Sequence, residues 1–350
     1  MLARLLAPSP GVSVSSRVER ILVTKQHNQM GDFIVASPLI ANLARLFPRA
    51  AIDVLASPIQ AEVAGLVPEV RRVWLVETNG ITKHAARLAG VVRALRRERY
   101  DLAIAVVTFS YSTTTAVLLA LSGARFRIAG RISQSPRGRS FFHREVVLPE
   151  GGHETDRALA HLAAIGAEPS TRTPRLAATR EEIETARVQL AARGWGPSDA
   201  VVAIHPGAGK RLNRWPAPLF GEVARRLLAR DDTRLILLAG PGEEPLLEAM
   251  GVPPGPRVAW MSGYPIRQVA AFLHNAALFL GNDTGKLHLA AAVGVPTLGL
   301  FGPTDPAVWA PVSAAGRSLR AAGGDLARLS ADLVDKELET MLVRLYSERH

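Results

Sequence analysis

A polar turn near the start of the chain, K-Q-H-N-Q-M-G-D at 25–32, carries residues that could do chemistry. It follows the strand-like run at 21–25 and precedes a helical pattern that continues through Phe47. Gly31 lets the backbone approach a ligand closely, and an ionised Asp32 could act as a general base for a hydroxyl within hydrogen-bond reach. Aspartate is also a favoured helix cap that needs no ligand. Both interpretations of Asp32 stay open at this point.

A second candidate is H-P-G-A-G-K-R-L-N-R-W-P at 205–216, directly after an apolar, β-branched run. Its prolines and glycines favour an open turn whose amides could face an anion, while Lys210 and Arg214 add positive charge. The spacing is not that of the phosphate-binding loop G-x-x-x-x-G-K-[ST], so it does not indicate an ATPase. We expect Trp215 to pack as the first core residue of the following helix.

A third candidate is G-N-D-T-G-K-L-H at 281–288, where a strand-like run ends and a helical pattern begins. The backbone amides of Thr284, Gly285 and Lys286 would face a phosphate, and the helix dipole favours negative charge there. His288 follows one helical turn later, on the side that faces the loop. A single histidine is more often structural than functional, but here it lies within a pattern that predicts phosphate binding.

The elements that must position these residues alternate along the chain. Strand-like runs lie at 21–25, 51–57, 70–76, 101–107, 201–205, 234–240, 277–281 and 296–302. Helical patterns separate most of them, which predicts right-handed βαβ units and parallel sheets. The alternation stops and restarts once, so we expect an α/β protein with two facing Rossmann-like domains. Ligands of such sheets bind at the carboxyl ends of the strands, which predicts a cleft between the two domains.

The chain has 350 residues, enough for two domains of ordinary size. We expect a loose N-terminal extension at 1–19, a first domain at 20–175 and a second domain at 176–325. We expect residues 326–350 to form a C-terminal helix that packs back toward the first domain.

The composition excludes several classes of function. A formal net charge of +11 favours anionic partners such as nucleotides, nucleic acids or membrane phosphates, but no RNA-recognition or zinc-finger pattern is present, so we expect no nucleic-acid partner. The absence of cysteine excludes disulfides, thiol nucleophiles and zinc sites with thiolate ligands. The longest apolar run, at 289–302, is shorter than the roughly 20 residues that a membrane-spanning helix needs.

A basic segment at 131–144 interrupts the first domain. It contains Arg137 and Arg139 beside two adjacent phenylalanines, Phe141 and Phe142. The segment is either a surface crossover or a contact region for an anionic acceptor or lipid headgroups, because arginine supplies charge and phenylalanine supplies interfacial anchoring.

The third candidate, extended to 281–306, resembles a known signature. Its strings G-N-D-T-G-x-x-H-L-A-A-A-x-G-x-P and F-G-P-T-D-P are similar to those of the ADP-heptose:lipopolysaccharide heptosyltransferases, glycosyltransferase family 9. The strings M-G-D at 30–32, H-P-G-A-G with W-P at 205–216, and L-L-A-G-P-G-E-E at 237–244 agree in order and spacing. The resemblance implies a GT-B fold and a transferase that inverts the configuration at the anomeric carbon. It also implies that the enzyme needs no cofactor and no metal.

The resemblance also implies roles for the matched residues. Asp32 takes the place of the general base. Asp283 matches the residue that contacts the donor sugar. His288 matches the histidine that lies near the donor sugar. Glu243 falls where the ribose hydroxyls are held, with Glu244 an equal candidate.

The other expected contacts extend over both domains. We expect donor contacts from Lys210, Arg214, Tyr264, Thr284, Gly285 and Lys286, with Tyr264 as a wall for the adenine. We expect acceptor contacts from Lys25, Arg137 and Arg139.

Two positions depart from the family pattern. The family's lysine two residues before W-P is Asn213 here, and the common proline of the third string is Lys286. Lys286 could itself meet the diphosphate, or Lys210, Arg211 or Arg214 could supply the missing charge.

We therefore expect transfer of heptose from ADP-heptose to a lipopolysaccharide-core or related surface glycan, at the inner face of the cytoplasmic membrane. Two alternatives remain: a nucleotide-sugar epimerase of the same fold, and a non-catalytic nucleotide-sugar binding protein. A dinucleotide oxidoreductase is disfavoured because no G-x-G-x-x-G follows the first strand.

Overall fold

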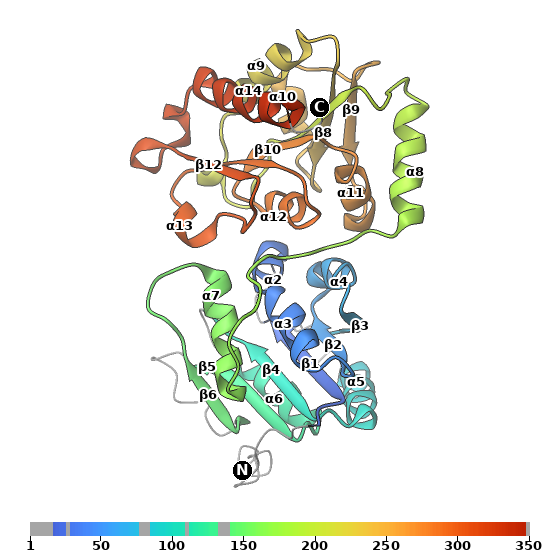
Figure 1. The fold of residues 1–350 in the computed structure, drawn as a ribbon, viewed down its shortest axis with the longest axis vertical. Coiled ribbons are helices and arrows are strands. Elements are labelled where there is room, and N and C mark those ends of the chain that lie inside the picture. The colour runs from blue at the N-terminus through green and yellow to red at the C-terminus, as the bar shows by residue number, and fades with distance from the viewer. Residues whose placement is uncertain (1–16, 26–28, 77–84, 109–111, 132–140, 348–350) are drawn as a thin grey trace. The chain divides into compact units, whose positions relative to one another are not determined.

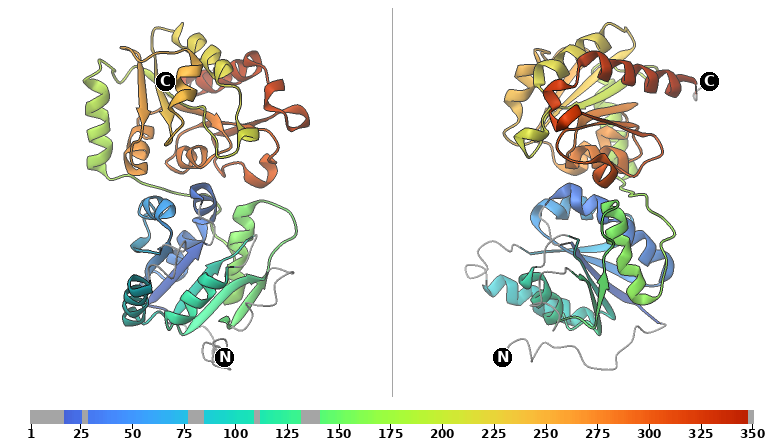
Figure 2. Two further views of the ribbon diagram at one scale, coloured as in Figure 1. Left: turned by 180° about the vertical axis from the view of Figure 1, so that it is seen from behind. Right: turned by 90° about the vertical axis from the view of Figure 1, so that its left-hand side faces the viewer.

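The computed structural model describes residues 17–25, 29–76, 85–108, 112–131 and 141–347. The chain divides into two compact units, Met1–Arg175 and Leu176–His350 (Figure 1). Each unit contains one six-stranded sheet in which every neighbouring pair of strands is parallel. Helices cover both faces of each sheet (Figure 2), as the alternation of strands and helices predicts.

The first unit has the strand order β3-β2-β1-β4-β5-β6. Its strands are β1 (Arg20–Lys25), β2 (Ala51–Ala56), β3 (Val70–Leu75), β4 (Leu102–Val106), β5 (Phe126–Arg131) and β6 (Arg144–Val147). Its helices are α2 (Met30–Ala36), α3 (Pro38–Leu46), α4 (Pro58–Ala64), α5 (Ala85–Glu98), α6 (Thr113–Leu121) and α7 (Glu154–Leu159), with a 3₁₀ helix at Ala160–Ile165. The strand order reverses between β1 and β4, and loops at such a point leave room for a ligand.

The second unit repeats this plan in the order β12-β11-β10-β7-β8-β9. Its strands are β7 (Ala200–His205), β8 (Thr233–Ala239), β9 (Val258–Ser262), β10 (Leu278–Asn282), β11 (Thr297–Phe301) and β12 (Gly316–Arg320). Its helices are α8 (Arg180–Ala191), α9 (Ala217–Leu228), α10 (Glu244–Met250), α11 (Ile266–Leu273), α12 (Gly285–Ala292), α13 (Pro306–Trp309) and α14 (Ala331–Ser347), with 3₁₀ turns at Arg211–Asn213, Ala322–Gly324 and Leu326–Arg328. Here the reversal lies between β7 and β10.

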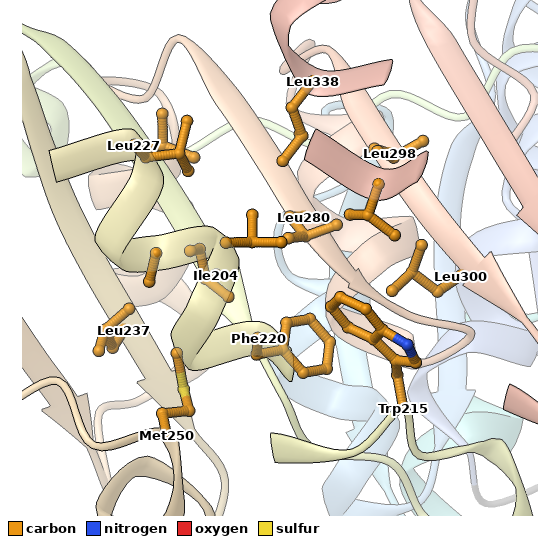
Figure 3. Packing of buried hydrophobic residues seen from close by; sticks show 14 of the residues in the cluster. Ile204, Trp215, Phe220, Leu227, Leu237, Met250, Leu280, Leu298, Leu300 and Leu338 are labelled. Atoms are coloured by element: carbon orange, nitrogen blue, oxygen red, sulfur yellow. The ribbon is translucent and has the colours of Figure 1, made fainter. Parts of the chain in front are cut away.

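One core cluster of the second unit joins the sheet to α9 and α14 (Figure 3). Trp215 is 1% exposed, so the prediction that it is a core residue is confirmed, but it lies just before α9 and not within it. Its ring meets Phe220 edge-on with 4.8 Å between the ring centroids. The Trp215 indole N–H donates to the carbonyl of Leu329 at 2.9 Å, which ties the start of α9 to the segment before α14. Burying aromatic side chains of this size is among the largest single contributions to such a core.

The C-terminal helix corrects our expectation that it packs back toward the first domain. α14 packs against α9, and its Val334, Leu338 and Leu342 belong to the same cluster as Leu298 and Leu300 of the sheet. Together with α9, α14 therefore covers this face of the second sheet. The apolar face of α14 is therefore needed by the second unit itself. The helix also begins at Ala331, after two 3₁₀ turns, rather than near 325.

Phe141 and Phe142 are each 5% exposed and belong to the core cluster of the first unit, with Tyr100 and Leu119. The interpretation of these phenylalanines as interfacial anchors is therefore wrong. Both rings complete the apolar layer between the sheet and α6. Among the described residues, no helix is both long and apolar enough to span a membrane.

Candidate functional site

A histidine–glutamate pair lies at the carboxyl edge of the second sheet. His205 is the last residue of β7, and Glu243 ends the loop between β8 and α10. The two side chains meet with 2.9 Å between His205 Nε2 and Glu243 Oε2. The Gly240 amide donates to the same carboxylate oxygen at 2.6 Å. Within the described residues Oε1 of Glu243 accepts no hydrogen bond, so this oxygen remains available to a ligand.

Two glycines make room for the pair. A Cβ atom at position 207 would overlap the Glu243 carboxylate, and one at position 240 would lie 2.8 Å from Glu243 Oε2. A Cβ atom at position 240 would also lie 3.1 Å from Nζ of Lys286. Gly207 and Gly240 thus allow the Glu243 carboxylate to approach the backbone closely. Lys286 reaches from α12 across to the end of β8.

Burial and charge fix the protonation of this cluster. Burial alone raises the pKa of Glu243, but the bonds from His205 and Gly240 and the charge of Lys286 outweigh it and hold that pKa at about 2. Burial lowers the pKa of His205 to about 4. The charges of Lys286 and Arg214 also lower this pKa, whereas Glu243 raises it. Burial also lowers the pKa of Lys286, against the raising effect of Glu243. At neutral pH the carboxylate is therefore ionised, and a neutral His205 donates to it through Nε2.

The turn at 206–214 is held to the end of β10 by one buried amide. Asn282 Oδ1 accepts from the Trp215 amide at 2.9 Å, and Asn282 Nδ2 donates to the carbonyl of Pro206 at 2.9 Å. Arg214 is half-buried and donates from Nε to the carbonyl of Ala208 at 2.8 Å. Because Arg214 also acts on His205, its charge belongs to the cluster, whereas Lys210 is exposed on the same turn.

The start of α12 presents unpaired polar groups. Thr284 caps the helix through an extended backbone, and its buried Oγ1 has no hydrogen-bond partner. The amides of Gly285 and Lys286 occupy the first turn, where no carbonyl of the helix can accept from them. Asp283 and His288 lie beside this turn with 3.8 Å between Oδ1 and Nε2. The arrangement suits an anion, because amide groups and the helix dipole add to the charge of Lys286.

The structure separates the two adjacent glutamates. Glu244 is on the first turn of α10 and accepts from the Ser262 hydroxyl at 2.5 Å, away from His205. Of the two glutamates, Glu243 is the one that joins the cluster with His205. Tyr264 follows β9, is 42% exposed, and packs edge-on against Phe272 with 6.0 Å between the ring centroids. Its ring is therefore a fixed, accessible surface next to the end of β8.

A second polar cluster lies at the carboxyl edge of the first sheet. Lys25 ends β1, is 6% exposed, and donates from Nζ to Thr108 Oγ1 at 2.6 Å. The Thr108 hydroxyl in turn bonds the Glu154 carboxylate on α7. Arg157, one turn later, lies 3.2 Å from Glu154 Oε1 and donates to the Thr108 carbonyl at 2.6 Å. These residues therefore lie at the carboxyl ends of β1 and β4, where the strand order reverses.

Asp32 lies in the first turn of α2, half-buried, and acts electrostatically on both Lys25 and Glu154. Burial lowers the pKa of Lys25 to about 8. The charges of Asp32 and Glu154 raise this pKa, whereas the charge of Arg157 lowers it further. Burial raises the pKa of Glu154, although Arg157, Thr108 and Lys25 oppose it. Lys25 is therefore still mostly protonated at neutral pH. An ionised carboxylate at Asp32 beside this cation could accept a proton from a bound hydroxyl.

Several members of both clusters are not among the site residues predicted from the sequence. His205 and Thr108 each lie at or just after the carboxyl end of a predicted strand, and that position was the available signal. Glu154 and Arg157 carried no signal, because they lie in a helical pattern far from any motif. Arg137 and Arg139 lie outside the described residues. Within those residues, no three or more histidine, aspartate or glutamate side chains come together as a metal site requires.

The chain is similar to known proteins over most of its length. The family model of glycosyltransferase family 9 (heptosyltransferase) matches residues 88–332. A lipopolysaccharide heptosyltransferase 3 of Escherichia coli is 28% identical over 294 residues, which cover 81% of this chain and 84% of that protein.

Two solved structures share the fold. A glycosyl transferase family 9 protein from Veillonella parvula has a TM-score of 0.82 at 21% identity, with coverage of 94% of this chain and 98% of that chain. The E. coli heptosyltransferase WaaC with ADP has a TM-score of 0.77 at 22% identity, with coverage of 92% and 99%. These likenesses show the GT-B fold. Because the family model matches most of the chain, the protein belongs to glycosyltransferase family 9 (heptosyltransferase) and is a glycosyltransferase.

Proposed function

We propose that this enzyme transfers a heptose from ADP-heptose to a lipopolysaccharide-core or related surface glycan acceptor, with inversion at the anomeric carbon. The E. coli relative carries the name lipopolysaccharide heptosyltransferase 3, and the WaaC structure contains ADP. Both support the donor and the acceptor class. The observation that carries the proposal is the cluster of His205, Glu243 and Lys286 next to the start of α12, because it joins a carboxylate for a sugar to cations and amides for a diphosphate.

In this proposal the second unit binds the donor. Oxygen Oε1 of Glu243 accepts hydrogen bonds from the ribose hydroxyls, while Oε2 is fixed by His205 and Gly240. The adenine lies against Tyr264. Asp283 contacts the sugar, with His288 behind it. The amides of Gly285 and Lys286 face the diphosphate.

The first unit supplies the base. The Asp32 carboxylate takes the proton of the acceptor hydroxyl as that oxygen bonds to the anomeric carbon, and the bond from this carbon to the diphosphate breaks. Lys25 stays protonated beside Asp32 and adds a positive charge that favours an anionic acceptor. Negative charge grows on the leaving ADP and is balanced by α12, Lys286 and Arg214. We propose that these groups replace a metal ion in this role.

The basic charge supports one further part of the proposal, that the enzyme works at the inner face of the cytoplasmic membrane, where it attaches peripherally to anionic lipids. We place this attachment on exposed basic residues rather than on Phe141 and Phe142, since both are buried.

The test is Asp32→Asn, which keeps the size of the side chain and removes the base. We expect kcat for transfer to fall at least about a hundredfold, since a general base contributes about 10²–10⁴. Calorimetric binding of ADP should not change. Asp156→Asn is the matched control, because Asp156 is also in the first turn of a short helix but pairs with Arg172 at 2.7 Å.

Full turnover by Asp32→Asn would remove the base assignment. Incubation of the donor alone separates the other two functions. Formation of an isomer without acceptor would favour an epimerase, and tight ADP binding without transfer to any acceptor would favour a binding protein.

A further inference from the structure

An arginine-rich cavity opens at the amino-terminal edge of the first sheet. Its volume is about 990 Å³, and it lies where β1, β4 and β5 begin. Six arginines line it: Arg20, Arg93, Arg96, Arg97, Arg99 and Arg125. The acidic residues in the lining are Glu19, Glu98 and Asp101. The cavity therefore carries an excess of positive charge.

The acidic residues of the cavity are already engaged. Glu98 forms ion pairs with Arg20, Arg71 and Arg72. Asp101 accepts from the amides of Glu19 and Arg20 at 2.9 and 3.1 Å. These carboxylates hold the strand starts and the base of the cavity, so they do not neutralise its rim.

Four arginines of the rim stay unpaired. Arg93, Arg96, Arg97 and Arg99 are exposed, and among the described residues their side chains make no ion pair or hydrogen bond. Arg93, Arg96 and Arg97 have the spacing of side chains that share one face of a helix, where like charges repel. An arrangement of this kind is stabilised when a polyanion binds between the guanidinium groups.

The backbone conformation at the end of α5 is a second indication of a ligand at this cavity. Arg99 has φ 55°, and it is the one non-glycine residue with positive φ in the described part of the chain. Glycine usually occupies this position after a helix, because only glycine adopts the conformation without strain. Here an arginine bears that strain, and its guanidinium lies at the rim of the cavity. Strained residues of this type are often retained for a ligand.

We propose that this cavity binds an anion with two or more closely spaced phosphate groups. Guanidinium groups suit such a ligand because each can bind phosphate oxygens through two parallel hydrogen bonds. The phosphates can belong to a soluble polyphosphate compound or to lipid headgroups, which share this chemistry. The proposal does not depend on the transfer reaction proposed above.

The cavity is separate from the cluster that contains Asp32. Arg20 and Lys25 are the two ends of β1, and a strand of six residues spans roughly 17 Å. A ligand in the cavity would therefore leave the carboxyl edge of the sheet open to an acceptor. Substitutions at the rim should accordingly leave transfer to a soluble acceptor unchanged.

The test uses the double variant Arg96→Gln/Arg97→Gln of the full chain. Arg180→Gln/Arg187→Gln on α8 is the matched control, because it removes the same charge from exposed positions of the second unit. Calorimetry with inorganic tripolyphosphate measures the soluble source. Co-sedimentation with phosphatidylcholine vesicles, with and without phosphatidylglycerol, measures the lipid source. Any tripolyphosphate bound at the start of α12 is common to both variants and cancels in the comparison.

We expect the rim variant to bind at least about tenfold more weakly than the control, which corresponds to the loss of strong guanidinium–phosphate contacts. A difference with tripolyphosphate alone would assign a soluble ligand, and a difference with anionic vesicles alone would assign lipid headgroups. Equal binding by the rim variant and the control in both assays, or no binding by the wild type in either, would overturn the proposal.

Discussion

Acidification should destabilise the second unit, and the buried His205 should account for a measurable share of the loss. His205 is 2% exposed and its pKa is lowered to about 4 by burial, whereas an unfolded histidine titrates near 6.5. Between these values the unfolded chain binds a proton that the folded chain does not bind. The free energy of unfolding therefore falls as the pH drops from 6.5 toward 4. His205→Gln removes this titration, while its amide can still donate to Glu243.

The magnitude follows from the two pKa values. At about pH 5 nearly every unfolded molecule carries the proton and few folded molecules do, which costs about 2 kcal/mol relative to pH 7.5. Glu243 does not contribute over this range. Its pKa is held at about 2, below the usual 4.5, so its share of stability is present above pH 4.5 and is lost only as the pH falls from 4.5 toward 2.

Urea denaturation at pH 7.5 and pH 5 would measure the effect. Tryptophan fluorescence reports mainly on the second unit, because it contains four of the five tryptophans: Trp195, Trp215, Trp260 and Trp309. The loss of unfolding free energy on acidification should be about 2 kcal/mol smaller in His205→Gln than in the wild type. Arg180→Gln, which does not titrate here, should keep the wild-type loss. An equal loss in the wild type and His205→Gln would refute the argument.

Two further predictions concern the reaction. Lys286→Met should weaken ADP binding about tenfold in calorimetry, since it removes a half-buried cation beside Glu243 and the start of α12. Lys336→Met on the exposed face of α14 should leave ADP binding unchanged. Unchanged ADP affinity in Lys286→Met would show that Lys286 does not supply the charge of the missing family lysine. Dialysis against EDTA should leave the transfer rate unchanged in a radiolabelled-donor assay, and a rate restored only by added Mg²⁺ would contradict the metal-free proposal.

The fold was predictable where strands are apolar and β-branched. Runs such as 101–107 and 234–240 appear as β4 and β8. Four strands, β5, β6, β9 and β12, were not predicted from the sequence. β6 and β12 are short edge strands with charged or small residues, so they lack the continuous apolar pattern of buried strands. β5 is interrupted by Arg127, whose buried guanidinium donates to the carbonyls of Phe141 and Ala124. Such a partner, distant along the chain, has no local signal.

Local pattern by itself determined the two α/β units, the three strand-to-helix turns and the presence of Asp32 and Lys286 on them, and the family resemblance added Glu243 on the loop after β8. These features depend on neighbouring residues: β-branched runs, glycines and helix starts. The tertiary structure decided that Glu243 rather than Glu244 meets His205, that Lys25 is joined to Glu154 through Thr108, and that α14 belongs to the second unit. Each of these outcomes depends on contacts between segments far apart in the chain. Burial at those contacts then shifts the pKa values of the ionisable side chains.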